Sequence, residues 1–262
     1  MNGEQGDGGV AQPACAFCTF GLIVTGEGER DFLPSFFRTL MERAGCTFKV
    51  LRQIGQRSPI SAPSRQRELQ IVGTGAKVLP KDVEEFGLEA RRFLKDQPCH
   101  FVLLIDDVEA ARLEVLPAIF ARYRQSLDAV LIPANLNSRA AVHFFANMVE
   151  AYYFAHADAV NIALETDVLD ADYADDVEKI GHPKNELKHR FQGFDEKTHG
   201  AAIVGNLDLD HVLSRPKSCA YLRALFGWCV RMLTQYCQVY DQTLPTRYGL
   251  SEGVQAELTR HQ

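Results

Sequence analysis

The stretch His100-Phe-Val-Leu-Leu-Ile105, followed directly by Asp106 and Asp107, decides the fold class of this chain. A short apolar run of this kind is typical of a strand that is buried on both faces of a parallel sheet. The run Phe20-Gly-Leu-Ile-Val-Thr25 has the same character and ends at a Gly26-Glu27-Gly28 turn. Helical patterns follow both runs, so the alternation predicts an α/β fold in which helices flank a parallel sheet.

Further elements are predicted outward from these two strands. Two more strands are expected over residues 47–54 and 129–133, with helices over residues 29–44, 82–96 and 109–126. The second half is expected to be mainly helical, over residues 140–157, 183–193 and 217–239. The predicted organisation is a disordered leader at residues 1–18, an α/β core at 19–138 and a helical extension packed on the core at 139–262.

Composition excludes several classes of protein. The chain has 262 residues, of which 46% are hydrophobic, and this fraction excludes a mostly disordered chain. No apolar run approaches the ~20 residues that cross a bilayer, which excludes an integral membrane protein. The start of the chain lacks the pattern of a signal peptide, so a cytoplasmic location is expected.

The seven cysteines are predicted to be buried thiols in a reducing compartment rather than a disulfide framework. Cys15-x-x-Cys18 has the spacing of a redox or zinc motif, but no second Cys-x-x-Cys or histidine pair completes a structural zinc site in the sequence. Buried thiols are therefore the favoured interpretation.

Charge is segregated along the chain. The sum of 28 basic and 34 acidic residues is −6, which argues against a protein that coats nucleic acid with its whole surface. Residues 52–81 nevertheless hold six basic residues and one acid, which is typical either of a loop that contacts phosphate or of a solvated insertion. Residues 165–178 hold seven acids and no base, so an exposed loop or helix surface that could meet a basic partner is expected there.

Carboxylates follow both predicted central strands. Glu27 comes after the first strand, and Asp106, Asp107 and Glu109 come after the third. Ligands of parallel α/β sheets bind beyond the carboxyl ends of the strands, and a hard divalent cation relieves the repulsion between carboxylates that meet there. Two simpler interpretations stay open: either aspartate could cap the following helix, and Glu29 could be a first-turn acid favoured by the helix dipole.

Three segments around these acids resemble a known family. They are Val24-Thr-Gly-Glu-Gly-Glu-Arg-Asp-Phe-Leu33, Leu103-Leu-Ile-Asp-Asp-Val-Glu109 and Met148-Val-Glu-Ala-Tyr-Tyr-Phe-Ala-His156. In this order they are similar to the TOPRIM-like proteins of bacterial defence islands. That family includes the nuclease subunits that accompany ABC-type ATPases in PARIS-type anti-phage systems. It is related to the TOPRIM domains of topoisomerases, primases and OLD nucleases. The stretch His182-Pro-Lys-Asn-Glu-Leu-Lys188 and the closing helix at Cys219-x-x-Leu222 are also similar, so the resemblance covers roughly residues 20–240.

The resemblance implies roles for particular residues. Glu27 matches a glutamate that acts as metal ligand or general acid–base group, and Asp106 matches the first aspartate of an Asp-x-Asp pair. The chain departs from that pair at Val108, so Asp107 or Glu109 would supply the second carboxylate. Glu150 matches the helical glutamate near the metal edge. His156 stands where the family often has an aspartate, and it is expected to be a structural histidine or a contact to phosphate or metal.

The activity implied is that of a metal-dependent nuclease. Mg²⁺ or Mn²⁺ would be held by Glu27, Asp106, Asp107, Glu109 and Glu150, with Glu27, Asp106 and Asp107 as the catalytic groups. The nucleic-acid backbone would meet the basic residues Arg30, Arg57, Arg65, Arg67 and Lys184. The resemblance further implies an ABC-type ATPase partner and an effector role in anti-phage defence.

Other interpretations stay open at this point. DNA, RNA and transfer RNA present the same phosphate, so the sequence does not distinguish among them as substrates. The apolar closing helix with Trp228 would serve as core and as the surface of a homodimer. A non-catalytic adaptor module of an ATPase complex is the main alternative, favoured by the irregular Asp106-Asp107-Val108 pattern. A small-molecule phosphotransferase is disfavoured because the chain has no Gly-x-x-x-x-Gly-Lys phosphate loop.

Overall fold

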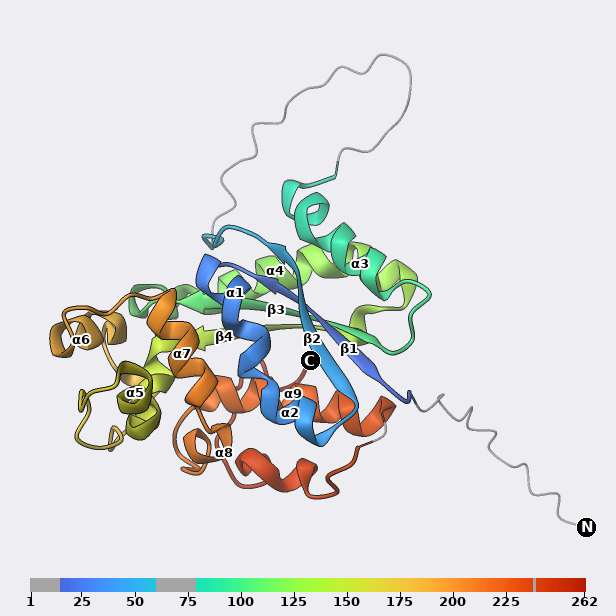
Figure 1. Cartoon of the computed structure of the whole chain (residues 1–262). Helices are drawn as coiled ribbons and strands as arrows, with labels where there is room; N and C mark the ends of the chain where they lie inside the picture. Colours follow the sequence, from blue (N-terminus) through green and yellow to red (C-terminus); the bar gives the residue numbers. More distant parts are fainter. Residues whose placement is uncertain (1–14, 60–78, 238) are drawn as a thin grey trace, which may run out of the picture.

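The described residues of the computed structural model are 15–59, 79–237 and 239–262, and they contain one sheet of four parallel strands in the order β2-β1-β3-β4 (Figure 1). The strands are β1 (Cys18–Val24), β2 (Cys46–Gln53), β3 (His100–Val108) and β4 (Ala140–Ala146). β1 and β3 pair in parallel from Thr19 with His100 to Val24 with Ile105, so both end at the same edge. The predicted α/β fold with a parallel sheet flanked by helices is confirmed.

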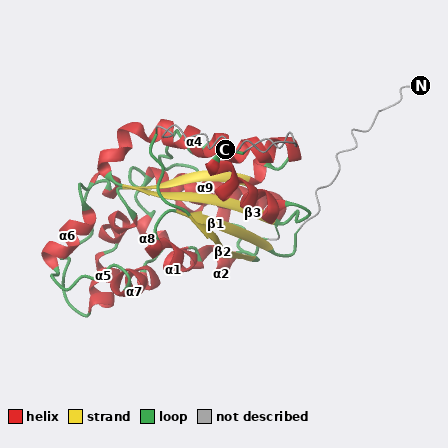
Figure 2. Cartoon of the chain, turned by 90° about the horizontal axis from the view of Figure 1, so that it is seen from above, coloured by secondary structure: helices red, strands yellow, loops and turns green. Residues whose placement is uncertain are grey.

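Helices cover both faces of the sheet. Their bounds are α1 (Glu27–Phe36), α2 (Arg38–Arg43), α3 (Leu88–Leu94), α4 (Leu116–Leu131), α5 (Ala157–Leu164), α6 (Pro183–Arg190), α7 (Thr198–Asn206), α8 (Leu209–Val212) and α9 (Ala220–Tyr236). α3 and α4 pack on one face, whereas α1, α2 and α9 pack on the other. Figure 2 shows α4 on one side of the strands and α1 and α2 on the other. The remaining short helices α5 to α8 extend the second layer past the carboxyl edge of the sheet (Figure 1).

Strand β3 shows how the sequence divides the core into two layers. Side chains alternate between the faces of a strand, and Phe101, Leu103 and Ile105 join the cluster under α1 and α9. Val102 and Leu104 join the separate cluster under α3 and α4. This alternation continues into the last residues of β3 and determines where its two aspartates point.

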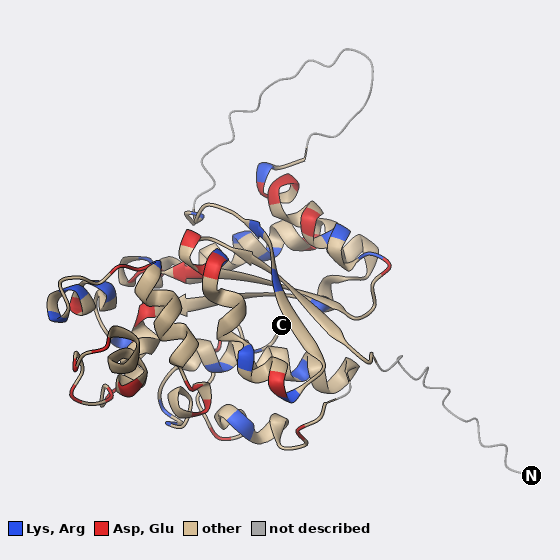
Figure 3. Cartoon of the chain, in the orientation of Figure 1, with Lys and Arg blue, Asp and Glu red and all other residues tan. Residues whose placement is uncertain are grey.

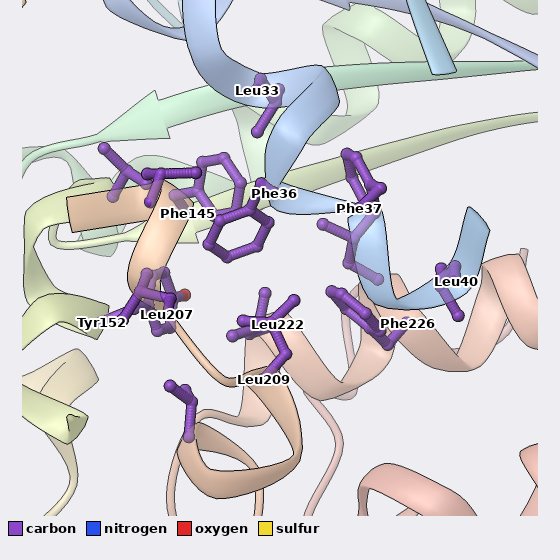
Figure 4. Close-up of a cluster of buried hydrophobic side chains, with 14 of the residues drawn as sticks. Leu33, Phe36, Phe37, Leu40, Phe145, Tyr152, Leu207, Leu209, Leu222 and Phe226 are labelled. Atoms are coloured by element: carbon purple, nitrogen blue, oxygen red, sulfur yellow. The ribbon is translucent and has the colours of Figure 1, made fainter. Parts of the chain in front are cut away.

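Aromatic side chains fill the layer between the sheet and α9 (Figure 4). Phe36 at the end of α1 lies edge-on to Phe145 of β4, with 5.5 Å between the ring centroids. Phe37 stacks on Phe226 of α9 at 5.8 Å. These ring contacts fix the end of α1 against the sheet and against α9.

The fourth strand lies elsewhere than the sequence pattern indicates. Residues 129–133 were expected to form it, but α4 continues to Leu131 and a short 3₁₀ turn follows. The strand is Ala140–Ala146, inside the stretch predicted as a long helix, and the sheet therefore runs past residue 138. The reason is tertiary: this alanine- and aromatic-rich run is buried at every position between two helical layers, which overrides local preference.

The acidic segment at residues 165–178 is only partly exposed. Its last member, Glu178, is buried and accepts hydrogen bonds from the backbone N–H groups of Tyr221 (2.9 Å) and Leu222 (3.2 Å) at the start of α9. The hydroxyl of Tyr152 donates to the same carboxylate at 2.8 Å. Burial raises the pKa of Glu178 to about 7. The segment thus anchors α9 as well as facing solvent.

Four cysteines are paired, contrary to the expectation that all would be thiols. Cys15 is bonded to Cys99 and Cys18 to Cys237, with Cα–Cα separations of 5.8 Å and 6.3 Å. The fold brings together the start of β1, the loop before β3 and the end of α9. Because these segments are far apart in the sequence, the spacing of the cysteines does not indicate the pairing. Residues 1–14 of the predicted leader lie outside the described residues. No helix in the described part of the chain has the length and apolarity to cross a membrane.

Candidate active site

Acidic side chains from three neighbouring strands meet at the carboxyl edge of the sheet. β1 leads into Thr25 and Glu29, β3 carries Asp106 and Asp107, and β4 is followed by Glu150. These strands are adjacent in the order β1-β3-β4 and run in parallel, so their ends share one edge. Figure 3 shows acidic positions at the start of α1 and the end of β3, on the side of the molecule where the basic positions of α6 also lie.

Asp106 points to the face that α4 covers. It is fully buried and accepts hydrogen bonds from the Thr25 hydroxyl at 2.9 Å and the Tyr123 hydroxyl at 3.1 Å. The Arg112 guanidinium forms an ion pair with it at 3.1 Å. Burial raises the pKa of Asp106, while Arg112 and the hydroxyl donors oppose that rise. Asp106 therefore has a complete set of protein partners.

Asp107 points to the opposite face, toward α1. Its Oδ1 accepts a hydrogen bond from the Val149 N–H at 2.9 Å, and its carboxyl group is hydrogen-bonded to the carboxyl of Glu29. Burial, followed by the charges of Glu29 and Glu150, raises the pKa of Asp107 well above its ordinary value. Burial also raises the pKa of Glu29. A hydrogen bond between two carboxyl groups requires that one of them carries a proton.

Glu29 reaches this position because Gly26 has no side chain. A Cβ atom at Gly26 would lie 1.9 Å from Oε2 of Glu29, so the turn after β1 admits only glycine while the glutamate stays there. Oε2 is buried and has no hydrogen-bond partner among the described residues. A buried carboxylate oxygen without a partner is costly, and it marks this group as available to a ligand.

Glu150 enters the cluster through an unusual turn after β4. Asn147 and Met148 both have positive φ values, of 58° and 75°. This conformation is costly for residues with side chains, and it presents the Val149 N–H to Asp107 and brings Glu150 into the site. Burial raises the pKa of Glu150 to about 7, and its Oε2 also lacks a partner in the described part of the chain.

Glu29, Asp107 and Glu150, hereafter the carboxyl cluster, line a pocket of about 260 Å³. Glu27, Glu196 and Lys197 lie at the same pocket. A second hollow of about 260 Å³ shares Met148 with it and is lined by Glu109, Asn147, His182 and Lys184 among others. The two hollows therefore lie next to each other at the end of the sheet.

Lysines surround the pocket from the helical layer. Lys197 is 3.0 Å from the carboxylate of Glu27, and Lys184 is 2.6 Å from that of Glu196. Lys188 reaches the same Glu196 oxygen at 3.3 Å. Burial opposes the charged form of Lys184, but the hydrogen bond with Glu196 and the negative charge of Glu196 outweigh it and raise the pKa of the lysine. The site thus combines buried carboxyls at its floor with cations at its rim.

The structure separates the predicted metal and catalytic residues into groups. Asp107 and Glu150 lie in the carboxyl cluster, as expected of acids at this edge. Glu27 is exposed at the pocket mouth and paired with Lys197, while Asp106 faces the other side of the sheet. Glu109 is exposed and lines the neighbouring hollow.

Glu29 is the functional candidate that the sequence assigned to another role. The sequence favours a first-turn acid at this position, yet Glu29 is the α1 glutamate whose carboxyl is hydrogen-bonded to Asp107. The signal that could have found it is the pair Gly26 and Glu29, since a small residue three positions before an acid leaves room for the side chain to fold back.

The basic residues predicted to contact nucleic acid also lie in different parts of the structure. Lys184 lies at the second hollow. Arg57 is held by Asp82 at 2.9 Å and by Glu85, and Arg30 by Asp31 at 2.8 Å, both away from the cluster lining. Arg65 and Arg67 lie outside the described residues. His156 accepts a hydrogen bond from the Asp208 N–H at 3.1 Å and contacts the His211 ring, so it serves as a structural group.

The donor chemistry of the carboxyl cluster fits a hard divalent cation. Three carboxyl groups, two of them with a partnerless buried oxygen, are the oxygen ligands that Mg²⁺ and Mn²⁺ take. In residues 15–59, 79–237 and 239–262, no group of three or more His, Cys, Asp or Glu side chains is arranged as a ready metal site. The hydrogen bond between Glu29 and Asp107 would have to open for both to serve as ligands.

Comparisons with protein-family models, with curated proteins and with solved structures give no match to this chain.

Proposed function

We propose that this chain is a divalent-metal-dependent nuclease whose active site is the carboxyl cluster. The observation that carries the proposal is that Glu29, Asp107 and Glu150 line one pocket at the carboxyl edge of a parallel sheet, with burial raising the pKa of each. Perturbed carboxyls gathered in a pocket are typical of catalytic sites. Lysines at the rim favour a polyanionic substrate.

Each group in the site has a role in this proposal. Glu29, Asp107 and Glu150 would hold Mg²⁺ or Mn²⁺, which lowers the pKa of a bound water and neutralises phosphate charge. Lys184 and Lys197 contact the phosphate backbone from the rim, where they already pair with carboxylates. Asp106, fixed by Thr25 and Arg112, holds the end of β3 so that Asp107 keeps its direction.

The biological setting comes from the resemblance described above. We propose a cytoplasmic effector of anti-phage defence that is controlled by an ABC-type ATPase, with DNA, RNA or transfer RNA as the substrate. Exposed carboxylates of the segment at residues 165–178 supply a surface for a basic partner. Co-purification of the chain with an ATPase encoded beside it, disrupted by Asp167→Lys and Asp170→Lys, tests this part separately from catalysis.

The experiment that tests the activity is a cleavage assay across nucleic-acid classes. Purified chain is incubated with labelled DNA, RNA and transfer RNA in Mg²⁺, in Mn²⁺ and in EDTA, with and without the ATPase. We expect metal-dependent cleavage that Asp107→Asn abolishes and that Glu252→Gln, an exposed acid away from the site, leaves intact. Equal cleavage by Asp107→Asn and wild type would overturn the assignment.

A non-catalytic adaptor is the second candidate, and two contacts favour it. The ion pair of Asp106 with Arg112 satisfies one predicted ligand inside the protein, and the shared proton of Glu29 and Asp107 stabilises the cluster without a metal. This alternative predicts no heat of Mg²⁺ or Mn²⁺ binding in calorimetry at millimolar metal. A binding isotherm that Asp107→Asn removes would count against it.

A further inference from the structure

Four of the seven cysteines meet at the edge of the sheet opposite the carboxyl cluster. Cys15 and Cys18 begin β1, Cys99 precedes β3 and Cys237 follows α9. Figure 1 shows the start of β1 beside the end of α9. β3, with nine residues at ~3.3 Å each, separates this edge from the carboxyl edge by about 30 Å. The nuclease proposal gives these cysteines no role.

Contacts on the backbone bring the four cysteines into one group. Cys15 is the β-bridge partner of Cys237, and its N–H donates to the Tyr236 carbonyl at 2.6 Å. Cys15 is bonded to Cys99 and Cys237 to Cys18, so each pair touches the other through the bridge. Bridge partners lie on neighbouring extended segments, which are roughly 4.8 Å apart. Four sulfur atoms from segments far apart in sequence therefore occupy one small region.

The remaining cysteines are set apart from this group by burial and bonding. Cys46, Cys219 and Cys229 are free and buried. Burial raises the pKa of Cys46 and that of Cys219 to about 12, so both stay protonated thiols. Cys99 and Cys237 are half-buried, which gives the group of four a route to solvent that the other three lack.

We propose that Cys15, Cys18, Cys99 and Cys237 bind one structural Zn²⁺ ion when the chain is reduced. Cys-x-x-Cys supplies two thiolates of a tetrahedral site, and the single cysteines at the other two segments complete the four that such a site requires. Cα separations of 5.8 Å and 6.3 Å leave room for sulfur atoms to converge on a shared ion. The sequence shows only one Cys-x-x-Cys pair, and the fold brings the two further cysteines of the site close to that pair.

The disulfide-bonded form and the zinc-bound form of these four cysteines exclude each other. Sulfur atoms that are bonded in pairs are not available as ligands, which agrees with the absence of a ready metal site among the described residues. From the reduced form, Zn²⁺ replaces the protons of four thiols and four protons are released. A reducing compartment keeps such cysteines as thiols, and zinc then ties the same three chain segments that the disulfides join.

Metal content of the reduced wild-type chain tests the proposal directly. The chain is expressed with zinc in the medium and purified in a phosphine reductant without chelator, and zinc is measured by plasma mass spectrometry. We expect about one zinc per chain. Stepwise addition of a mercurial should release that zinc after four thiols have reacted, as read by a metallochromic dye.

Matched variants locate the ion. Cys18→Ser and Cys99→Ser should each lower the zinc content at least fivefold, whereas Cys219→Ala and Cys229→Ala should retain it. Glu29→Gln and Asp107→Asn should also retain zinc, which separates this site from the proposed nuclease site. Failure of nuclease activity with zinc still bound would therefore leave this inference standing.

Two results would overturn the proposal. One is a reduced wild-type chain with less than a tenth of a zinc per molecule, a measurement that does not depend on any variant folding. The other is zinc that persists in Cys18→Ser and Cys99→Ser but disappears in Asp107→Asn, which would place the ion at the carboxyl edge.

Discussion

Glu29 and Asp107 are hydrogen-bonded through their carboxyl groups, although they belong to different elements and both are acids. Burial raises the pKa of both carboxyls, so the pair retains a proton that two exposed carboxylates would lose. In neutral solution the pair carries less negative charge than two separate carboxylates would. A divalent cation at the cluster must displace this proton, which makes metal binding dependent on pH.

The first prediction concerns this pair. Glu29→Gln and Asp107→Asn should each lower metal-dependent cleavage at least 100-fold, because each removes a carboxylate that would hold the cation. The free energy of unfolding of each variant should stay within about 1 kcal/mol of wild type or rise. The amide that replaces the carboxyl keeps a hydrogen bond and removes a buried charge. Single-turnover cleavage and urea denaturation measure the two effects.

Glu27→Gln provides the matched comparison for Glu29, two residues away on the same helix. Its side chain is exposed and pairs with Lys197 at the pocket mouth. We expect Glu27→Gln to retain at least a third of the metal affinity that calorimetry gives for wild type. A larger loss in Glu27→Gln than in Glu29→Gln would return the ligand role to Glu27, as the family resemblance implies.

The second prediction concerns pH and Glu150. Burial raises the pKa of this carboxyl from 4.5 to about 7, so the folded chain binds its proton more tightly than the unfolded chain. The stability from this group is full below about pH 4.5 and is lost as pH rises through 7. Glu150→Gln removes that dependence and should be more stable than wild type at pH 8, by on the order of 2 kcal/mol.

Urea denaturation of wild type and Glu150→Gln at several pH values between 5 and 8 measures this difference. The difference between the two proteins isolates Glu150 from the other titrating groups. Addition of 5–10 mM Mg²⁺, roughly a saturating concentration for a weak carboxylate site, should stabilise wild type more than the variant at pH 8. Parallel curves for the two proteins across the range would show that Glu150 keeps an ordinary pKa.

The third prediction concerns Asp106 and its ion pair with Arg112. Asp106→Asn leaves the partly buried guanidinium without its counter-charge and should lower the free energy of unfolding by about 2–4 kcal/mol. Tyr123→Phe removes a single hydrogen bond to the same carboxylate and should cost about 1 kcal/mol. Metal affinity should change less than tenfold in either variant. A stable Asp106→Asn variant that binds no metal would show that Asp106 is a ligand instead.

The fourth prediction concerns the lysines at the rim. Lys184→Gln and Lys197→Gln should each weaken binding of single-stranded or duplex nucleic acid and lower the slope of log affinity against log salt by about 1. Lys95→Gln, at the other edge of the sheet, is the control and should leave the slope unchanged. Fluorescence anisotropy titrations at several salt concentrations provide the slopes, and equal slopes for all of these proteins would place the nucleic acid elsewhere.

The sequence predicted the central strands of the fold well because their burial is uniform. β3 is apolar from Phe101 to Ile105 and buried on both faces, which leaves little else for that run to form. The fourth strand was not predictable in the same way. The run Ala140–Ala146 is apolar without a period that distinguishes helix from strand, and the layers that cover both sides of it make it a strand.

The site was predicted as a region but not residue by residue. Asp106 and Asp107 are adjacent in a strand, so they point to opposite faces and only one can enter a given pocket. Glu27 and Glu29 likewise lie about 200° apart around a helix. Which member of each pair faces the cluster depends on how β3 and α1 are rotated against their neighbours, and core packing such as that of Phe36 on Phe145 determines this rotation.

The loop between α6 and α7 supplies the pocket with a counter-ion of its own. Glu196 occupies Lys184 and Lys188 in the way that a bound phosphate would. An external anion that binds Lys184 or Lys188 must therefore displace Glu196, and its net affinity is the difference between two competing ion pairs. If the loop that carries Glu196 moves, Lys184 and Lys188 lose their counter-ion while the carboxyl cluster stays as it is.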